Sequence, residues 1–250
     1  MRERGLPLSP MMARATVRAI SPKTMTRRLV SPPRGCELVN LLDSEEDDRY
    51  SGRHDDPASW GYPFYEDSAP AVLSDWLSLC PYGGVGDRLY GREAWRTLSK
   101  YDSLPPRDVP TTAPIWYEAD GRAPPEFGRY RHGRFMVRWM ARIVREVTSI
   151  AVERLSSISE ADAMREGIER EDGVVVGAEC YGGHHHEITA TRYFIPGLYE
   201  EQEQPALNEV PGFAYATSAL FRLWEILHGP GSCDADPWLW VIGFGPVPAP

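Results

Sequence analysis

The chain has 250 residues, of which 42% are hydrophobic, and it carries a formal net charge of −9. This length is typical of one large domain or of one domain with insertions, and the absence of any run of about 18 apolar residues excludes a transmembrane helix. No apolar signal segment follows the N-terminal arginines and the four cysteines are widely spaced, so we expect a cytoplasmic protein with reduced thiols and no place in a membrane.

The N-terminal segment favours a short helix. Ala13, Val17 and Ile20 recur at helical spacing. Ser9, followed by proline, is a typical start signal because proline is tolerated in the first helical turn. We therefore predict a helix over residues 11–20 that packs its apolar side into the core and leads the chain into the next polar segment.

Residues 20–30 combine a lysine, two threonines and two arginines between apolar flanks. Threonine and valine favour an extended strand, in which alternation places Thr26 with Arg28 on one face and Lys23 on the other. A bulge, or the turn before the strand, would bring Lys23 round to Thr26. An amine beside a hydroxyl, with a guanidinium nearby, is typical of an acyl-transfer or phosphate site. An exposed polar strand is the alternative interpretation.

Three stretches show weak periodicity and many acidic, proline or glycine residues, which is typical of solvated loops. We expect insertions near residues 31–79, 99–132 and 169–212. In the first, aromatic residues at positions 60–65 either pack as a lid or stack on a base. Within these insertions, we predict that residues 40–58 and 178–190 are loops.

The third stretch holds three consecutive histidines, His184 to His186, close to Cys180 and Glu187. Such side chains can ligate a transition metal, although their spacing matches no established metal motif. A polar loop is the alternative interpretation, and we expect the function of the chain to need no metal and no cofactor.

Residues 87–95 favour a central strand that follows a glycine-rich turn. Gly91 indicates a bulge or the close approach of another backbone. Alternation places Glu93 beside Trp95 on a mainly apolar face. A carboxylate on such a face either pairs with an arginine of the N-terminal polar segment or has a raised pKa, which makes Glu93 a candidate for both a structural and a binding role.

Four later segments have clear periodicity or turn signals. They predict a strand over residues 115–119, a helix from 159 to 167, a helix over 216–228 and a final strand over 238–244. In the first of these helices, Ser159 is a natural N-cap with Asp162 three residues later, and Gly167 ends the helix. Glu166 lies in the last turn, where the helix dipole disfavours a carboxylate, which favours a functional reason for its presence.

The motif S-P-K-T-M-T-R-R at residues 21–28 resembles the G-x-K-x-x-E-x-R signature of the ASCH domains, a branch of the PUA-like β-barrel superfamily. It departs at Ser21, where the family has glycine, and at Thr26, where many members have glutamate. The form K-T-x-T-x-R is similar to that of the small bacterial N4-acetylcytidine amidohydrolases. Further blocks resemble ASCH-type proteins of phages and prophages, and they lie at residues 4–9, 80–83, 86–95, 140–143, 223–224 and 237–241.

The resemblance implies an α+β fold in a single domain over residues 1–250, with a PUA-like (ASCH) β-barrel, flanking helices, long loop insertions and a strand over residues 141–152. It also implies amide hydrolysis of an N-acylated nucleobase in the cytoplasm of a bacterial host cell. Thr26 would be the nucleophile, and Lys23 its base, with an amine pKa lowered by neighbouring arginines. Glu166 matches a catalytic glutamate in an A-x-x-E run and would exchange protons with the leaving amine.

We expect substrate contacts from the cationic and aromatic side chains of the two polar strands and from one carboxylate: Arg27, Arg28, Arg88, Trp95 and Glu93. If the two strands meet in the core, Glu93 lines one cleft together with Lys23, Thr26 and Arg28. That shared cleft is the sharpest geometric prediction of the sequence.

The charge is unevenly distributed. Residues 1–34 and 86–145 carry net charges of +7 and +5, whereas residues 35–80 and 146–250 carry −9 and −12. If the two basic segments meet, they form a local positive surface that suits a nucleoside or a single-stranded or modified nucleic acid. Three alternatives to a hydrolase stay open: a non-catalytic reader of a flipped or single-stranded base, a ribonuclease, and a phage assembly or host-interaction protein.

Overall fold

The computed structural model describes residues 1–20, 22–30, 39–40, 60–61, 77, 80–181, 184–195 and 212–248, with side chains for all of these except 39–40, 60–61 and 177–186. Residues 41–59, which hold nearly all of the predicted loop at 40–58, lie outside this description. On either side of them, strands β3 (Val39–Asn40) and β4 (Trp60–Gly61) pair with each other. Across the described ranges, no helix has the length and apolar character needed to cross a bilayer.

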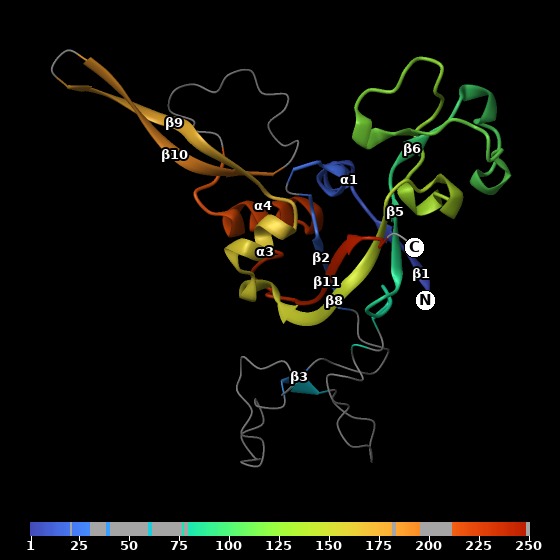
Figure 1. Cartoon of the computed structure of the whole chain (residues 1–250), viewed down its shortest axis with the longest axis horizontal. Helices are drawn as coiled ribbons and strands as arrows, with labels where there is room; N and C mark the ends of the chain where they lie inside the picture. The colour runs from blue at the N-terminus through green and yellow to red at the C-terminus, as the bar shows by residue number, and fades with distance from the viewer. Residues whose placement is uncertain are drawn as a thin grey trace.

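Five strands form the central sheet of a mixed α+β structure (Figure 1). Their order is β1 (Glu3–Pro7), β5 (Arg88–Arg92), β8 (Val144–Arg154), β11 (Trp238–Pro246) and β2 (Met25–Leu29). β1 runs parallel to β5, and the other neighbours are antiparallel. Because β1 and β2 are the two edges, the described strands form an open sheet and not the closed barrel that the sequence predicts.

The two edges of the sheet approach each other through a side chain. Nη2 of Arg28, in β2, donates a hydrogen bond to the carbonyl of Pro7, in β1, over 2.6 Å. Pro7 has no N–H group to offer in return, and both edge strands have 5 residues, which leaves little backbone for a closing ladder. The contact holds Arg28 beside the chain that leads into the first helix.

Strand β11 forms the centre of the core. Its residues from Leu239 to Phe244 are all buried, because β11 has neighbours on both sides and is covered on both faces. This explains the continuous apolar run that predicts a strand at residues 238–244, and the prediction is confirmed. Strand β8 likewise confirms the strand predicted at 141–152, with a start and an end that lie slightly later in the chain.

Helix α1 (Pro10–Val17) begins where the sequence predicts, since the Ser9 hydroxyl accepts a hydrogen bond from the Met12 N–H and caps the helix. It ends earlier than predicted. Val17 and Ile20 are exposed, so their predicted place in the core is wrong. The chain leaves the helical path after Val17 because it turns back along α1, where Lys23 N–H binds a helix carbonyl. The buried face of α1 consists of Met12, Ala13, Ala15 and Thr16.

Helices α3 (Glu160–Arg165) and α4 (Ala216–His228) match the predicted helices and pack against each other. The Ser159 hydroxyl accepts a hydrogen bond from the Asp162 N–H, which confirms the predicted cap. Glu160 then caps α4, because its carboxylate accepts hydrogen bonds from the N–H groups of Ala216 and Thr217. This cap, which links the two helices, fixes the place where α4 begins and directs its apolar face toward the core.

Strands β9 (Glu169–Tyr181) and β10 (His184–Phe194) form a long antiparallel hairpin that projects away from the sheet (Figure 1). The prediction of a loop at residues 178–190 is therefore wrong for the backbone. Runs rich in valine, threonine and tyrosine flank Gly182-Gly183, and two glycines between such runs are typical of a hairpin turn. The acidic residues of this stretch favoured the loop prediction over this hairpin pattern.

Residues 95–142 form an irregular lobe beside the sheet, as the proline-rich composition of residues 99–132 predicts. Strands β6 (Trp95–Arg96) and β7 (Trp116–Tyr117) pair within it, and β7 confirms the short strand predicted at 115–119. The lobe has its own small core of Trp95, Val109, Ala113, Met136 and Met140. Its turns are 3-10 helices at Ser99–Tyr101, Pro106–Asp108, Glu118–Asp120, Gly133–Phe135 and Arg138–Met140, and a further one at Leu155–Ser157 precedes α3.

The glycine in β5 provides a test of its packing against Leu8 and Ile143. A Cβ atom added to Gly91 would lie 2.9 Å from Cβ of Ile143 and 3.1 Å from Cδ1 of Leu8, so side chains and not a second backbone approach it. We expect Gly91→Ala to lower the free energy of unfolding by about 1–3 kcal/mol, measured by urea denaturation, because the core is overpacked. Gly84→Ala is the control, since a Cβ there meets nothing within 4 Å. Equal losses for the two variants would contradict this packing.

Candidate functional site

Three backbone hydrogen bonds fix the segment that carries the predicted lysine. Lys23 N–H donates to the carbonyl of Ala15 in α1 over 2.8 Å, and Thr24 N–H donates to the carbonyl of Arg165 in α3 over 2.9 Å. The Thr24 carbonyl accepts a bond of 2.8 Å from Phe244 N–H in β11. The segment is thus held by α1, α3 and the central strand at once, and Lys23 is only 2% exposed.

The Lys23 amine is neutralised by Glu166, which follows α3. Its Nζ atom lies 2.5 Å from Oε2 of Glu166 and 2.6 Å from the carbonyl oxygen of the same residue. Glu166 is itself only 5% exposed. The helix dipole disfavours a carboxylate at this position, but the buried ammonium group of Lys23 compensates for that cost. The ion pair therefore explains why a glutamate lies at the end of α3.

Arg27 ties this ion pair to the neighbouring acidic side chains. Its Nη1 atom lies 3.4 Å from Oε1 of Glu166, and its Nη2 atom lies 3.1 Å from Glu153 and 3.5 Å from Asp162. The Arg27 side chain is almost fully buried. The guanidinium is thus surrounded by three carboxylates, and its first role is to balance their charge.

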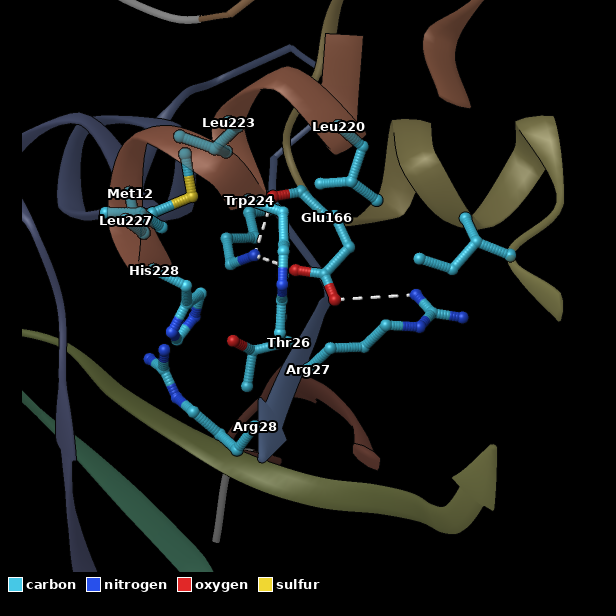
Figure 2. Close-up of a pocket in the computed structure, with 12 residues that line it drawn as sticks. Met12, Thr26, Arg27, Arg28, Glu166, Leu220, Leu223, Trp224, Leu227 and His228 are labelled. Atoms are coloured by element: carbon cyan, nitrogen blue, oxygen red, sulfur yellow. Dashed lines mark hydrogen bonds and ion pairs between the residues drawn. The ribbon is translucent and has the colours of Figure 1, made fainter. Parts of the chain in front are cut away.

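A pocket opens beside the ion pair, between β2 and α4 (Figure 2). In this view Leu220, Leu223 and Trp224 of α4 lie on one side, and Thr26 and Arg28 of β2 lie on the other. The cavity itself is small, about 40 Å³, and it opens into a wider mouth. Its lining residues are Met12, Lys23, Thr26, Arg27, Arg28, Ile158, Glu166, Leu220, Leu223, Trp224, Leu227 and His228.

Lys23, Thr26 and Glu166 therefore line one pocket, as the resemblance implies. Simple strand alternation places Lys23 and Thr26 on opposite faces, but β2 begins only at Met25. Lys23 precedes the strand, so strand alternation does not fix the direction of its side chain. Both side chains line the pocket, and the hydrogen bonds of the Lys23 amine go to Glu166.

Burial lowers the pKa of Lys23 below its ordinary value of 10.5. The charge and hydrogen bond of Glu166 act in the opposite direction, and the positive charges of Arg28 and Arg27 lower the pKa further. The arginines lower the pKa of Lys23, as expected, but burial of the amine lowers this pKa more. The result is an amine that loses its proton more readily than a lysine in water.

Three predicted substrate-binding residues, Arg88, Glu93 and Trp95, are absent from the lining of this pocket. The prediction that Glu93 shares a cleft with Lys23 and Thr26 is wrong. Its carboxylate is buried against Arg142, with Nη2 and Nε of that arginine at 2.8 and 3.0 Å. Trp95 is fully buried in the core of the lobe, and Arg88 lies in β5, on the opposite side of the sheet order from β2. In the order of the sheet, β8 and β11 lie between β5 and β2.

His228 and Trp224 are pocket residues that the sequence did not single out as functional. Their rings stack with centroids 4.1 Å apart, because the two residues are one helical turn apart in α4. Burial and the charge of Arg28 lower the pKa of His228, so the imidazole is held toward its neutral form. The sequence pattern that could have identified them is a histidine four residues after a tryptophan, at the end of a predicted helix.

The described residues contain no group of three or more histidine, cysteine or acidic side chains arranged for a metal ion. The side chains of His184 to His186 and Cys180 lie outside the described residues, so the two interpretations of that cluster are unchanged. Cys80 and Cys233 are free thiols. The chemistry that the described pocket offers is that of an amine, a hydroxyl and a carboxylate.

Replacing Glu166 tests how much stability depends on the buried pair. Glu166→Gln leaves the Lys23 ammonium without its carboxylate, so we expect the free energy of unfolding in urea to fall by about 3–5 kcal/mol. Adding Lys23→Met to this variant should restore part of the loss, since the unpaired charge is removed. Glu169→Gln is the matched control, because its pair with Arg18 is partly exposed and is expected to contribute about 1 kcal/mol or less. Similar losses for Glu166→Gln and Glu169→Gln would contradict a dominant buried pair.

Comparisons with protein-family models, with curated proteins and with solved structures found no match for this chain. The resemblance to the ASCH domains rests on the sequence motifs alone. Lys23, Thr26, Arg28 and Glu166 carry that resemblance and line one pocket.

Proposed function

We propose that the pocket hydrolyses the amide bond of an N-acylated nucleobase, with Thr26 as the nucleophile. The observation that carries this proposal is the buried ion pair of Lys23 and Glu166 in the wall of a pocket that also contains Thr26. A nucleophilic hydroxyl needs a base, and a leaving amine needs an acid. One lysine–glutamate pair can supply both, without a metal ion or a cofactor.

The first step requires Lys23 in its neutral form. A proton that passes from Nζ to Oε2 of Glu166 converts the ion pair into a neutral amine and a carboxylic acid, and burial favours this exchange because it removes two charges from a poorly solvated place. The same proton shift therefore creates the base and the acid together. The contact between Arg27 and Glu166 opposes the shift and keeps the resting state ionic.

Lys23 Nζ then takes the hydroxyl proton of Thr26 as Oγ1 attacks the acyl carbonyl carbon. The carbon–nitrogen bond breaks as Glu166 gives its proton to the leaving nitrogen, which leaves a threonine ester and the original ion pair. In the second half, the Glu166 carboxylate takes a proton from water, and the resulting hydroxide attacks the ester. The Thr26 oxygen leaves with the proton of the Lys23 ammonium, so the neutral pair returns and every proton is accounted for.

The rest of the pocket supports a flat, partly apolar substrate. Trp224, Leu220 and Leu223 offer an apolar wall for a ring, and Arg28 offers positive charge for the oxyanion that forms during acyl transfer. Neutral His228 can exchange hydrogen bonds with the polar edge of a base. These features favour a nucleobase over an aliphatic amide.

We also propose that the chain is a cytoplasmic member of the ASCH branch and that its sheet is a PUA-like barrel with a gap between β1 and β2. The contact of Arg28 with Pro7 supports this, because it joins the two edges where a closed barrel has a backbone ladder. A second function, binding of a modified base without turnover, is favoured by one observation. The Glu166 carboxylate is engaged by both Lys23 and Arg27, as a purely structural group would be.

Thr26→Val separates the two functions. Valine keeps the shape of threonine but has no hydroxyl, so we expect it to reduce the release of cytidine from N4-acetylcytidine by about 10³-fold or more. Liquid chromatography measures the product, and intact-mass analysis of the wild-type protein should show an acyl adduct that is absent from Thr26→Val. Thr26→Ser is the control and should keep measurable turnover. Binding of the substrate with no turnover by the wild-type protein would leave the reader function in place of the hydrolase.

The pH dependence of turnover tests the shared proton. The active pair holds one proton, so turnover should fall as the pH rises through the pKa of Lys23, which burial sets below 10.5. Arg28→Gln removes a positive charge that lowers this pKa, so the fall should move to higher pH. Arg28→Lys keeps the charge and should leave the position of the fall nearly unchanged. Turnover that instead increases with pH through this range would contradict the shared proton and indicate that Lys23 acts as a simple base.

A further inference from the structure

The irregular lobe carries a surface on which cationic and aromatic side chains alternate. Residues 129–135 contain three arginines, a tyrosine, a histidine and a phenylalanine, and no acidic residue. We call the exposed members of this segment the arginine–aromatic surface, which consists of Arg129, Tyr130, His132, Arg134 and Phe135. It belongs to a different part of the fold from the pocket beside Lys23.

The charges of this surface are not neutralised locally. Other arginines of the lobe pair with carboxylates: Arg96 with Glu118, Arg138 with Glu3, and Arg142 with Glu93. Within the described part of the chain, neither Arg129 nor Arg134 forms an ion pair of this kind. The nearby Asp102 carboxylate accepts hydrogen bonds from the backbone N–H of Arg129. Two guanidinium groups are therefore available to an anion from outside.

Tyr130 and Phe135 lie beside these charges, and each is 51% exposed. They line an open hollow of about 350 Å³ together with Pro106, Arg129, Arg131 and His132. The Arg134 guanidinium lies over the Phe135 ring, 4.7 Å from its centroid. Large aromatic faces that stay exposed next to unpaired arginines are typical of surfaces that stack a planar ring and bind its negative charge.

The surface is built on a rigid support. Arg131 is only 5% exposed and donates hydrogen bonds to the carbonyls of Leu104, Tyr101 and Asp102. Its guanidinium also lies over the buried ring of Trp95, 5.1 Å from the centroid. These contacts fix residues 129–135 against the turn at 101–104, so little conformational entropy is lost when a ligand binds.

We propose that the arginine–aromatic surface binds single-stranded nucleic acid. Unstacked bases would lie on the rings of Tyr130 and Phe135, and phosphates would lie against Arg129 and Arg134. A duplex hides its base faces and offers nothing to the rings. An acidic peptide has the charge but lacks successive planar rings. Because the whole chain is acidic, with a net charge of −9, the contact is confined to this local surface and involves few phosphates.

Fluorescence anisotropy with a labelled single strand of about 12 nucleotides tests this directly. We expect Tyr130→Ala and Phe135→Ala each to weaken binding by about 10-fold, since a stacking surface is lost. Arg129→Gln and Arg134→Gln should each weaken binding and reduce the dependence on salt. With two phosphate contacts, the logarithm of the wild-type affinity should fall with the logarithm of salt concentration with a slope of about −1.4.

Two control variants replace an arginine and a tyrosine that lie outside the arginine–aromatic surface. Arg107→Gln removes an 83% exposed arginine of the same lobe that pairs with Asp108, and Tyr215→Ala removes a 62% exposed tyrosine next to α4. Both should leave the affinity nearly unchanged.

A duplex of the same sequence and a polyglutamate peptide should compete poorly. Failure of the single strand to bind, equal competition by the duplex or the peptide, or equal losses in the controls would each overturn the proposal. Because no variant here touches the pocket, hydrolysis of N4-acetylcytidine is measured in parallel and should stay unchanged in all of them.

Discussion

The buried ion pair of Lys23 and Glu166 is the interaction on which the rest of the structure depends. Both groups are almost fully removed from water, and each alone would cost several kcal/mol to bury in its charged form. Lys23 reaches the carboxylate and the carbonyl of a residue 143 positions later, and Arg27 completes the balance. A buried ion pair is stable only if the backbone segments that carry the two charges are held in fixed positions relative to each other.

The backbone around the pair shows how that place is defined. Lys23 and Thr24 are hydrogen-bonded to α1, α3 and β11, so two helices and the central strand converge on the lysine. Gly167, with φ of +106°, follows the glutamate, and a Cβ atom there would lie 3.0 Å from Ala15 and 3.4 Å from Lys23. The turn after α3 therefore needs a glycine both for its backbone angle and for the close approach of α1.

The distribution of charge follows from the same constraint. The sequence suggests that the basic segments at 1–34 and 86–145 combine into one positive surface, but Arg27 and Lys23 pair with carboxylates of β8 and α3, from the acidic C-terminal half. In the second basic segment, Arg142 pairs with Glu93. Among the described residues, Arg129 and Arg134 form no such ion pair, and the Asp102 carboxylate beside Arg129 is bound to the backbone N–H of that residue.

The sequence by itself determined the local features. The caps at Ser9 and Ser159, helix α4 and the apolar strand β11 depend on short-range patterns, and the structure shows each where it was predicted. The grouping of Lys23, Thr26 and Glu166 is implied by the resemblance, and the three residues line one pocket. Only the tertiary structure decided the partners of the charged residues. Glu93, just after β5, pairs with Arg142, just before β8, because β5 and β8 are hydrogen-bonded neighbours in the sheet. Spacing along a chain fixes which side chains share a helix or a strand face, whereas the order of strands, and with it the contacts between distant charges, is set by packing of the whole core.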